Sequence, residues 1–253
     1  MTVRRVAVTV PLDVAEVARA WMLAISPEGF EEIDRGDALE LAAYADPVRE
    51  ERIRLRFGAV EVSELPDDWR ERWRAFHRPV RIGPLWIGPP WEEPTGDAVP
   101  VVIDPGRAFG TGAHATTRLC VELLLGLPPG AVLDIGSGSG VLAIAAARLG
   151  HRPVIAVDND PAAVEATAEN AAANGVDVDA RLADAFVDDL PRADAVLANA
   201  SFSAVPTLAA RIDTLRFVTS GYFAIGQPHA PGFEHRERRE RDGWAADLFE
   251  RSQ

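Results

Sequence analysis

The spacing of apolar residues changes in character near residue 65. In the first part, alternating stretches typical of strands are interleaved with stretches whose apolar positions recur at helical spacing. The expected elements are strands at 6–10, 29–33, 39–44 and 59–63, and helices at 12–25 and 47–57. This strand–helix–strand–strand–helix–strand order predicts a small α+β ferredoxin-like domain over residues 1–65. The helix over 12–25 is expected to pack through one apolar face formed by Val14, Val17, Ala18, Trp21 and Ile25.

Residues 66–98 form a different kind of segment. Asp67 and Asp68 could start a helix that places Trp69 and Trp73 on one face, and residues 79–94 are rich in proline, glycine and tryptophan. We expect a linker helix followed by an extended segment that packs between two domains.

From residue 99 onward, short apolar strands alternate with helices. The expected strands lie at 132–135, 154–158, 177–182 and 193–198, the expected helices at 141–149 and 161–174, and a closing hairpin at 233–249 turns at Asp242-Gly243. Such alternation produces right-handed crossovers and a parallel sheet. The second domain, residues 99–253, is therefore predicted to be an α/β Rossmann-like domain.

Composition narrows the class of partner. The 253-residue chain carries a net charge of −13, which repels phosphate backbones, so direct nucleic-acid binding is not expected and a basic protein partner is favoured over it. Plain solubility is the favoured explanation of the charge. No stretch is apolar enough for a membrane span, and the first residues lack the apolar region of a signal peptide, so we expect a cytoplasmic protein. The single cysteine, Cys120, excludes an internal disulfide and a cysteine metal cluster, and is expected to be a small buried apolar residue.

A glycine-rich turn joins the strand at 132–135 to the next helix. Its glycines, Gly136, Gly138 and Gly140, would let a ligand approach the backbone at a helix N-terminus. The spacing differs from the G-x-G-x-x-G pattern of nicotinamide enzymes, because position 141 is valine, and Asp134 lies on the strand itself. Both details favour S-adenosylmethionine (SAM) as the ligand, with Asp134 near its methionine end. A nicotinamide oxidoreductase is a disfavoured alternative.

The next strand ends on Asp158, at the position where a carboxylate can accept hydrogen bonds from both ribose hydroxyl groups. Asp160 and Pro161 follow, and we expect Asp160 to cap the helix that begins there. Asp158 is therefore the predicted ribose ligand, and Asp160 a structural residue.

Two further strand ends could complete the site. Asp184 and Ala185 follow the third strand and could meet the adenine through a carboxylate and a backbone N–H; a solvated loop aspartate is the alternative for Asp184. Asn199 ends the fourth strand, and its amide could hold the methionine end of the cofactor or the incoming amine, unless it serves only a turn.

Three strings of residues identify a family. Residues 104–117 read DPGRAFGTGAHATT, residues 132–146 read VLDIGSGSGVLAIAA, and residues 158–161 read DNDP. Together they resemble the ribosomal protein L11 methyltransferase family of bacteria, and the likeness continues into the linker and the first domain. The resemblance implies a first domain that recognises the protein substrate, a Rossmann-like catalytic domain that binds SAM, and methylation of the N-terminal α-amine and lysine side chains of ribosomal protein L11.

The resemblance also implies site residues. Thr117, Gly136, Asp158 and Asn199 match the cofactor-binding positions of the family, and the neighbouring loop would be formed by Phe109, Gly110 and Thr111. His114 is a candidate proton acceptor, and a hydrogen bond that orders the loop is its equally weighted alternative. Gly138, Asp134, Asp184 and Ala185 remain as candidates from the strand pattern. No metal site is expected.

The chain departs from the family at two places. The family usually continues Asn-Ile-Leu-Ala after the fourth strand, where this chain has Asn199-Ala200-Ser201-Phe202. The family also has a glycine pair before the fifth strand and a full helix after it, whereas Pro228 and Pro231 make that helix improbable here. These changes leave open a different methyl acceptor, namely another protein lysine or a small-molecule amine, or a SAM-binding module without catalysis.

Overall fold

The computed structural model describes residues 4–26, 30–64, 78–104 and 112–252. The chain divides into two compact units, Met1–Phe76 and His77–Gln253, which are described separately. The expected linker helix around Trp69 and Trp73 lies outside the described residues.

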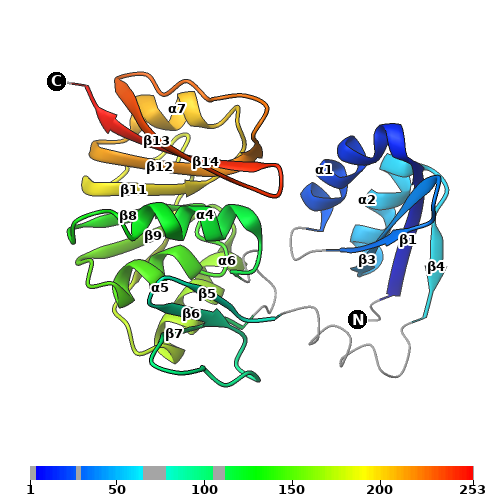
Figure 1. Cartoon of the computed structure of the whole chain (residues 1–253), viewed down its shortest axis with the longest axis horizontal. Helices are drawn as coiled ribbons and strands as arrows, with labels where there is room; N and C mark the ends of the chain where they lie inside the picture. The colour runs from blue at the N-terminus through cyan, green and yellow to red at the C-terminus, as the bar shows by residue number, and fades with distance from the viewer. Residues whose placement is uncertain (1–3, 27–29, 65–77, 105–111, 253) are drawn as a thin grey trace. The chain divides into compact units, whose positions relative to one another are not determined.

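The first unit is a four-stranded antiparallel sheet with two helices on one face (Figure 1). Its elements in chain order are β1 (Arg4–Pro11), the 3₁₀ turn η1 (Leu12–Val14), α1 (Ala15–Ile25), β2 (Glu31–Asp34), β3 (Ala38–Ala45), α2 (Pro47–Phe57) and β4 (Glu61–Ser63). The strand order is β2-β3-β1-β4, so the two strands that precede helices, β1 and β3, lie in the centre. The predicted ferredoxin-like element order is confirmed.

The buried face of α1 differs from the predicted one. Ala15, Ala18 and Met22 pack into the core of this unit, and Met22 is fully buried, whereas Val17 and Trp21 are 58% and 42% exposed. Of the predicted face, Ala18 and Ile25 contact this core, whereas Val14, Val17 and Trp21 are exposed. The buried face is therefore displaced from the predicted one by about one residue, or about 100° of helix rotation. Trp21 instead lies under the guanidinium of Arg56 from α2, 3.3 Å from its ring centroid.

The second unit is built around a seven-stranded sheet in the order β10-β9-β8-β11-β12-β14-β13. Its strands are β8 (Val132–Ile135), β9 (Val154–Asp158), β10 (Asp179–Leu182), β11 (Ala193–Asn199), β12 (Thr214–Phe223), β13 (Phe233–Arg241) and β14 (Trp244–Arg251). Pairing is parallel from β10 through β12, and β14 runs antiparallel to both of its neighbours. The Rossmann-like fold is as predicted, and the closing hairpin supplies the antiparallel edge.

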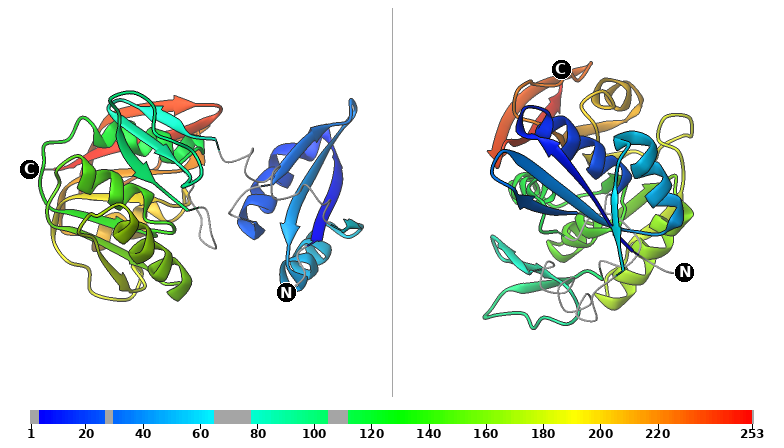
Figure 2. Two further views of the ribbon diagram at one scale, coloured as in Figure 1. Left: turned by 90° about the horizontal axis from the view of Figure 1, so that it is seen from below. Right: turned by 90° about the vertical axis from the view of Figure 1, so that its right-hand side faces the viewer.

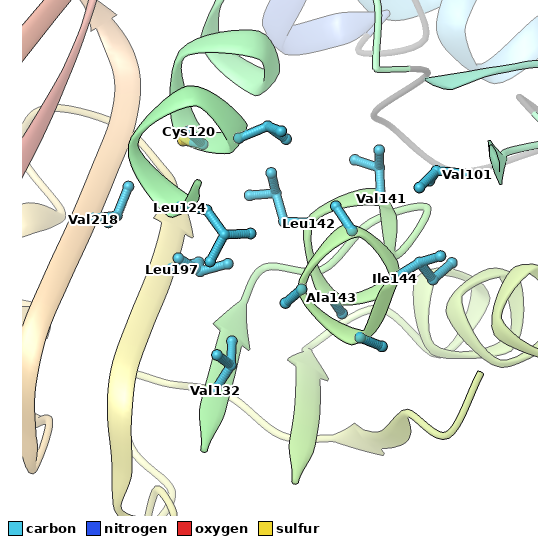
Figure 3. Packing of buried hydrophobic residues seen from close by; sticks show 14 of the residues in the cluster. Val101, Cys120, Leu124, Val132, Val141, Leu142, Ala143, Ile144, Leu197 and Val218 are labelled. Atoms are coloured by element: carbon cyan, nitrogen blue, oxygen red, sulfur yellow. The ribbon is translucent and has the colours of Figure 1, made fainter. Parts of the chain in front are cut away.

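Helices cover both faces of this sheet. On one face α4 (Ala115–Leu124) and α5 (Val141–Arg148) pack on the strands through aliphatic residues such as Leu124, Leu142 and Leu197, as Figure 3 shows. On the other face α7 (Val205–Arg211) packs on the side chains of β11 and β12. The helix α6 (Pro161–Ala173) follows β9. Cys120 is fully buried in the core between α4 and the sheet, as the sequence predicts.

The segment expected to be an extended linker belongs to a second, smaller sheet. This sheet consists of β5 (Val80–Ile82), β6 (Leu85–Gly88) and β7 (Val99–Val102) (Figure 2). Its apolar side chains join the core that contains α4 and α5. Trp86 is buried there, which gives the proline- and tryptophan-rich stretch a role inside the second unit. Residues 224–232, between β12 and β13, form no helix, as the two prolines predict. No helix in the described ranges is long and apolar enough to cross a bilayer.

Candidate functional site

The predicted site residues follow four neighbouring parallel strands. Asp184 follows β10, Asp158 ends β9, the glycine turn follows β8 and Asn199 ends β11. The carboxyl ends of parallel neighbours lie at one edge of a sheet, which is where open α/β folds bind ligands. The backbone N–H of Ala183 donates to the carbonyl oxygen of Asp158 at 2.9 Å, which ties the ends of β9 and β10 together.

The glycine turn requires glycine for two different reasons. Gly136, Gly138 and Gly140 have φ values of 70°, 55° and 79°, in the left-handed region that other residues rarely adopt. A Cβ at Gly140 would also lie 3.1 Å from the Cα of Thr167, so α6 leaves no room for it. A Cβ at Gly136 would meet nothing within 4 Å in the described part of the chain. The space beside Gly136 is thus open to a ligand.

Side chains of α6 hold the turn in place. Thr167 Oγ1 donates to the carbonyl oxygen of Gly138 at 3.1 Å and lies 3.0 Å from Ser137 Oγ, and Asn170 Nδ2 donates to the carbonyl oxygen of Ser139 at 2.9 Å. Sequence reasoning missed both α6 residues. Their signal was available: polar residues recur at 167, 170 and 174, at helical spacing, in a helix otherwise rich in alanine.

Asn170 and Asn174 connect α6 to β7 and to Asp104 beyond its end. Asn170 Oδ1 accepts the backbone N–H of Asp104 at 3.0 Å, and Asn174 makes hydrogen bonds with both the N–H and the carbonyl of Val102. Asp104 opens the family-like string of residues 104–117. The predicted loop residues Phe109, Gly110 and Thr111 lie outside the described residues.

Asp134 is buried beneath the turn at 1% exposure. Its Oδ2 accepts the backbone N–H of Ala143 at 3.1 Å, in the first turn of α5, whose N-cap Gly140 offers no side chain. Burial, with a smaller contribution from the charge of Asp158, raises the pKa of Asp134 from 3.8 to about 7, although the Ala143 hydrogen bond opposes the shift. Its Oδ1 is buried and accepts no hydrogen bond within the described ranges, so it is suited to a cationic or hydrogen-bond-donating ligand.

Asp158 and Asp160 have different local roles. Asp158 Oδ2 accepts the N–H of Gly138 at 3.0 Å and its Oδ1 accepts the N–H of Asp160 at 3.0 Å. Asp160 Oδ1 accepts the N–H of Ala162 at 2.9 Å and so caps α6, as the sequence predicts. Each Asp158 oxygen keeps a second acceptor position for a ligand hydroxyl group.

Asp184 takes part in a tight turn. Its Oδ1 accepts the N–H of Phe186 at 2.9 Å, and its own N–H donates to Asp188 Oδ2 at 2.8 Å. One carboxylate oxygen of Asp184 is thus engaged within its own loop, and the contact of Asp184 with an adenine stays a prediction. Ala185 is buried, and its carbonyl accepts Arg211 Nε at 2.8 Å, so its place beside Asp184 is fixed by α7.

Asn199 meets the N-terminus of α4. Its Nδ2 donates to Thr116 Oγ1 at 3.0 Å, and Thr116 Oγ1 lies 2.8 Å from His114 Nδ1. His114 is the N-cap of α4, and burial lowers its pKa. Thr117 is buried at 1% exposure, and its Oγ1 has no hydrogen-bond partner among the described residues. Sequence reasoning singled out Thr117 and passed over Thr116, which makes the contact to Asn199.

These groups fit SAM. Two buried oxygen atoms, Asp134 Oδ1 and Thr117 Oγ1, lack protein partners in the part of the chain that the structure describes, and the turn at Gly136 is open. The oxygen-rich set Asp134, Asp158 and Thr117 suits a ligand that carries positive charge and hydroxyl groups.

Comparison with known proteins identifies the family. The family model "Ribosomal protein L11 methyltransferase (PrmA)" matches residues 34–251. A ribosomal protein L11 methyltransferase of Symbiobacterium thermophilum is 39% identical over 81% of this chain and 77% of its own. One from Pseudomonas putida is 40% identical over 80% and 76%. The crystal structure of a ribosomal protein L11 methylase from Lactobacillus delbrueckii subsp. bulgaricus is 28% identical, with a TM-score of 0.60 over 70% of this chain and 100% of that one.

The match spans both sides of the glycine turn and reaches from the first unit to the last strand. It includes the three strings that carry the resemblance in the sequence. The chain therefore belongs to the ribosomal protein L11 methyltransferase family of SAM-dependent enzymes.

Proposed function

We propose that this protein transfers methyl groups from SAM to amines of ribosomal protein L11, namely its N-terminal α-amine and lysine side chains. The observation that carries the proposal is the family match over residues 34–251 together with the open glycine turn at the carboxyl ends of the strands. The acidic chain, with a net charge of −13, suits a basic protein partner. We also propose that the enzyme acts in the cytoplasm.

We propose roles for the site residues from the strand ends on which they lie and from the resemblance to the family. Gly136, Gly138 and Asp158 hold the nucleoside, with Asp158 on the ribose, while Asp184 and Ala185 border the adenine. Asp134, Thr117 and Asn199 hold the methionine end, together with the loop of Phe109, Gly110 and Thr111. We assign recognition of the protein substrate to the first unit and methyl transfer to the second.

When bound, SAM would supply a methyl group bonded to a positively charged sulfur. A neutral amine would form an N–C bond to this methyl carbon as the C–S bond breaks and its electron pair passes to sulfur, leaving S-adenosylhomocysteine, and the methylated amine would then lose a proton to solvent. The protein then contributes alignment, which can supply several kcal/mol of the barrier reduction. An α-amine has a pKa of about 7.7–8.0, so a fair fraction is neutral without a strong base. A lysine amine, at about 10.4, needs desolvation or a nearby proton acceptor.

A second candidate keeps the SAM chemistry but changes the acceptor to another protein lysine or a small-molecule amine. Residues 200–203 differ from the family, and no helix forms in residues 224–232. The two segments lie close together, because a Cβ at Gly226 would lie 3.4 Å from the ring of Phe202. Ala200, which follows β11, also donates its N–H to the carbonyl of Ser220 in β12.

The test is incubation with methyl-labelled SAM and purified ribosomal protein L11, followed by peptide mass spectrometry. Label on the L11 amino terminus and lysines supports the proposal. Label on another protein or on a small amine, with none on L11, supports the second candidate. SAM binding without transfer to any acceptor indicates a non-catalytic module.

A further inference from the structure

Thr116 lies at the centre of a hydrogen-bonded chain that links the start of α4 to the end of β11. It is 2% exposed, and its Oγ1 is within 3.0 Å of Asn199 Nδ2 and 2.8 Å of His114 Nδ1. A hydroxyl group has one hydrogen to donate, so the direction of one contact decides the direction of the other.

The position of His114 as the N-cap residue of α4 determines which way the Thr116 hydroxyl group donates its hydrogen. The backbone N–H of Thr116 points at His114 Nδ1, at 3.4 Å. The carbonyl oxygen of His114 accepts the N–H of Arg118 at 3.1 Å, so the helix begins directly after His114. A hydrogen on Nδ1 would oppose the amide hydrogen of Thr116, so Nδ1 is an acceptor. The Thr116 hydroxyl then donates to His114 Nδ1 and accepts from Asn199.

We propose that Thr116 is a positioning residue that fixes the side-chain amide of Asn199 and the tautomer of His114. Asn199 must present Nδ2 to Thr116, so its Oδ1 is left to accept a hydrogen bond from the methyl-acceptor amine or the cofactor. Asn199 Oδ1 makes no hydrogen bond in the described ranges, which agrees with this assignment.

The hydrogen bonds that link His114, Thr116 and Asn199 also determine the tautomer of His114. With Nδ1 accepting from Thr116, the ring proton of neutral His114 is on Nε2, so the ring is a hydrogen-bond donor at its other nitrogen rather than a base. The ring is also held edge-on against Trp244, with centroids 5.0 Å apart. Of the two alternatives weighed from the sequence, the geometry favours the ordering role over the general base.

The direct readout is nitrogen NMR of protein labelled with ¹⁵N-histidine, without any acceptor present. The proposal predicts the Nε2–H tautomer for His114, with the signal identified by its loss in His114→Asn, and a shift of that signal in Thr116→Val. A His114 protonated on Nδ1 would overturn the proposal. Since this readout needs no substrate, it is independent of the proposed function on which the kinetic test below rests.

The kinetic test compares Thr116→Val, which removes the hydroxyl group with little change in shape, with Thr116→Ser, which keeps it. We expect Thr116→Val, which frees the Asn199 amide, to lower kcat about tenfold or more, and Thr116→Ser to retain most of kcat. His114→Asn keeps an N-cap acceptor for Thr116, so its kcat should fall less than about tenfold, against the 10²–10⁴-fold loss expected on removing a general base. An unchanged kcat in Thr116→Val, or a general-base-sized loss in His114→Asn, contradicts the proposal.

Discussion

A carboxylate oxygen of Asp158 accepts the backbone N–H of Gly138 at 3.0 Å. The contact joins the end of β9 to the turn after β8, so the residue proposed to bind the ribose also shapes the turn beside which the cofactor is proposed to lie. Binding and local structure are coupled at this site, and variants must be chosen to separate them.

The glycine turn allows such a separation. Gly140→Ala should destabilise the fold by about 1–3 kcal/mol, because its Cβ would meet the backbone of Thr167 in addition to adopting a strained φ. Gly136→Ala incurs only the φ cost, of about 1 kcal/mol, but its Cβ would enter the space assigned to SAM. Denaturant unfolding and calorimetry with SAM should show the larger stability loss in the first variant and the affinity loss in the second. Full SAM affinity in folded Gly136→Ala would place the cofactor elsewhere.

The raised pKa of Asp134 makes the stability of the ligand-free protein depend on pH. Its folded-state pKa of about 7 lies above the ordinary 3.8, so between these values the ligand-free folded chain holds a proton that the unfolded chain has lost. This group therefore lowers stability progressively as pH rises from about 4 to about 7, and its effect is constant above that range. Asp134→Asn should remove this contribution, so the variant should gain stability relative to the parent as pH rises through that range.

SAM binding should act on the same proton. The positive charge of SAM favours the ionised carboxylate, so binding below about pH 7 should release a proton from Asp134. Calorimetry in buffers of different ionisation enthalpy measures the number released, and Asp134→Asn is the control that should release fewer. Equal release by both proteins would show that Asp134 is not the titrating group.

A buried carboxylate outside the site should dominate stability in the closing hairpin. Asp247 is fully buried and accepts hydrogen bonds from Tyr222 at 2.9 Å and His235 at 2.8 Å, with Arg238 3.5 Å away. Asp247→Ala removes the acceptor that these groups share, while Tyr222 keeps its contact with Thr219 and Arg238 its contact with Glu240. The free energy of unfolding should therefore fall by about 1–3 kcal/mol. The control is Glu250→Ala on the same strand, whose exposed pairs with Arg236 and Arg216 should contribute about 0–1 kcal/mol. Similar losses in urea unfolding of the two variants would contradict this account.

Cys120 offers a probe of opening. It is fully buried, and burial raises the pKa of its thiol, so a thiol reagent should react with the folded protein only after the core around α4 opens. The chain has one cysteine, so the reaction reports this site alone. Labelling should be slow in native buffer and complete in denaturant; rapid labelling of the native protein would place α4 outside the stable core.

Much of this arrangement follows from local pattern. The strand ends at Asp158 and Asn199 and the helix cap at Asp160 are each set by neighbours in sequence, and sequence reasoning predicted them. The contacts it missed join distant segments: Asn170 to Asp104, and Thr116 to Asn199. Such pairs depend on how α4 and α6 pack on the sheet, which the period of a helix does not specify.

The face of α1 shows a second limit. Both the stripe through Val17 and Trp21 and the stripe through Ala18 and Met22 have helical spacing. The structure buries the second, and the cation–π contact of Arg56 with Trp21 accompanies the exposed ring. A single sequence cannot choose between two apolar stripes when the partner strand is unknown.

Calorimetry of SAM binding to Asp158→Ala and to Asp160→Ala tests most directly whether SAM binds beside the glycine turn with its ribose on Asp158. Asp158→Ala should weaken SAM binding by roughly 1–3 kcal/mol through the loss of charge-assisted hydrogen bonds. Asp160→Ala should cost about 1 kcal/mol of stability through the lost cap, with SAM affinity retained. Unchanged affinity in Asp158→Ala, or binding of NAD in place of SAM by the parent protein, would contradict the account.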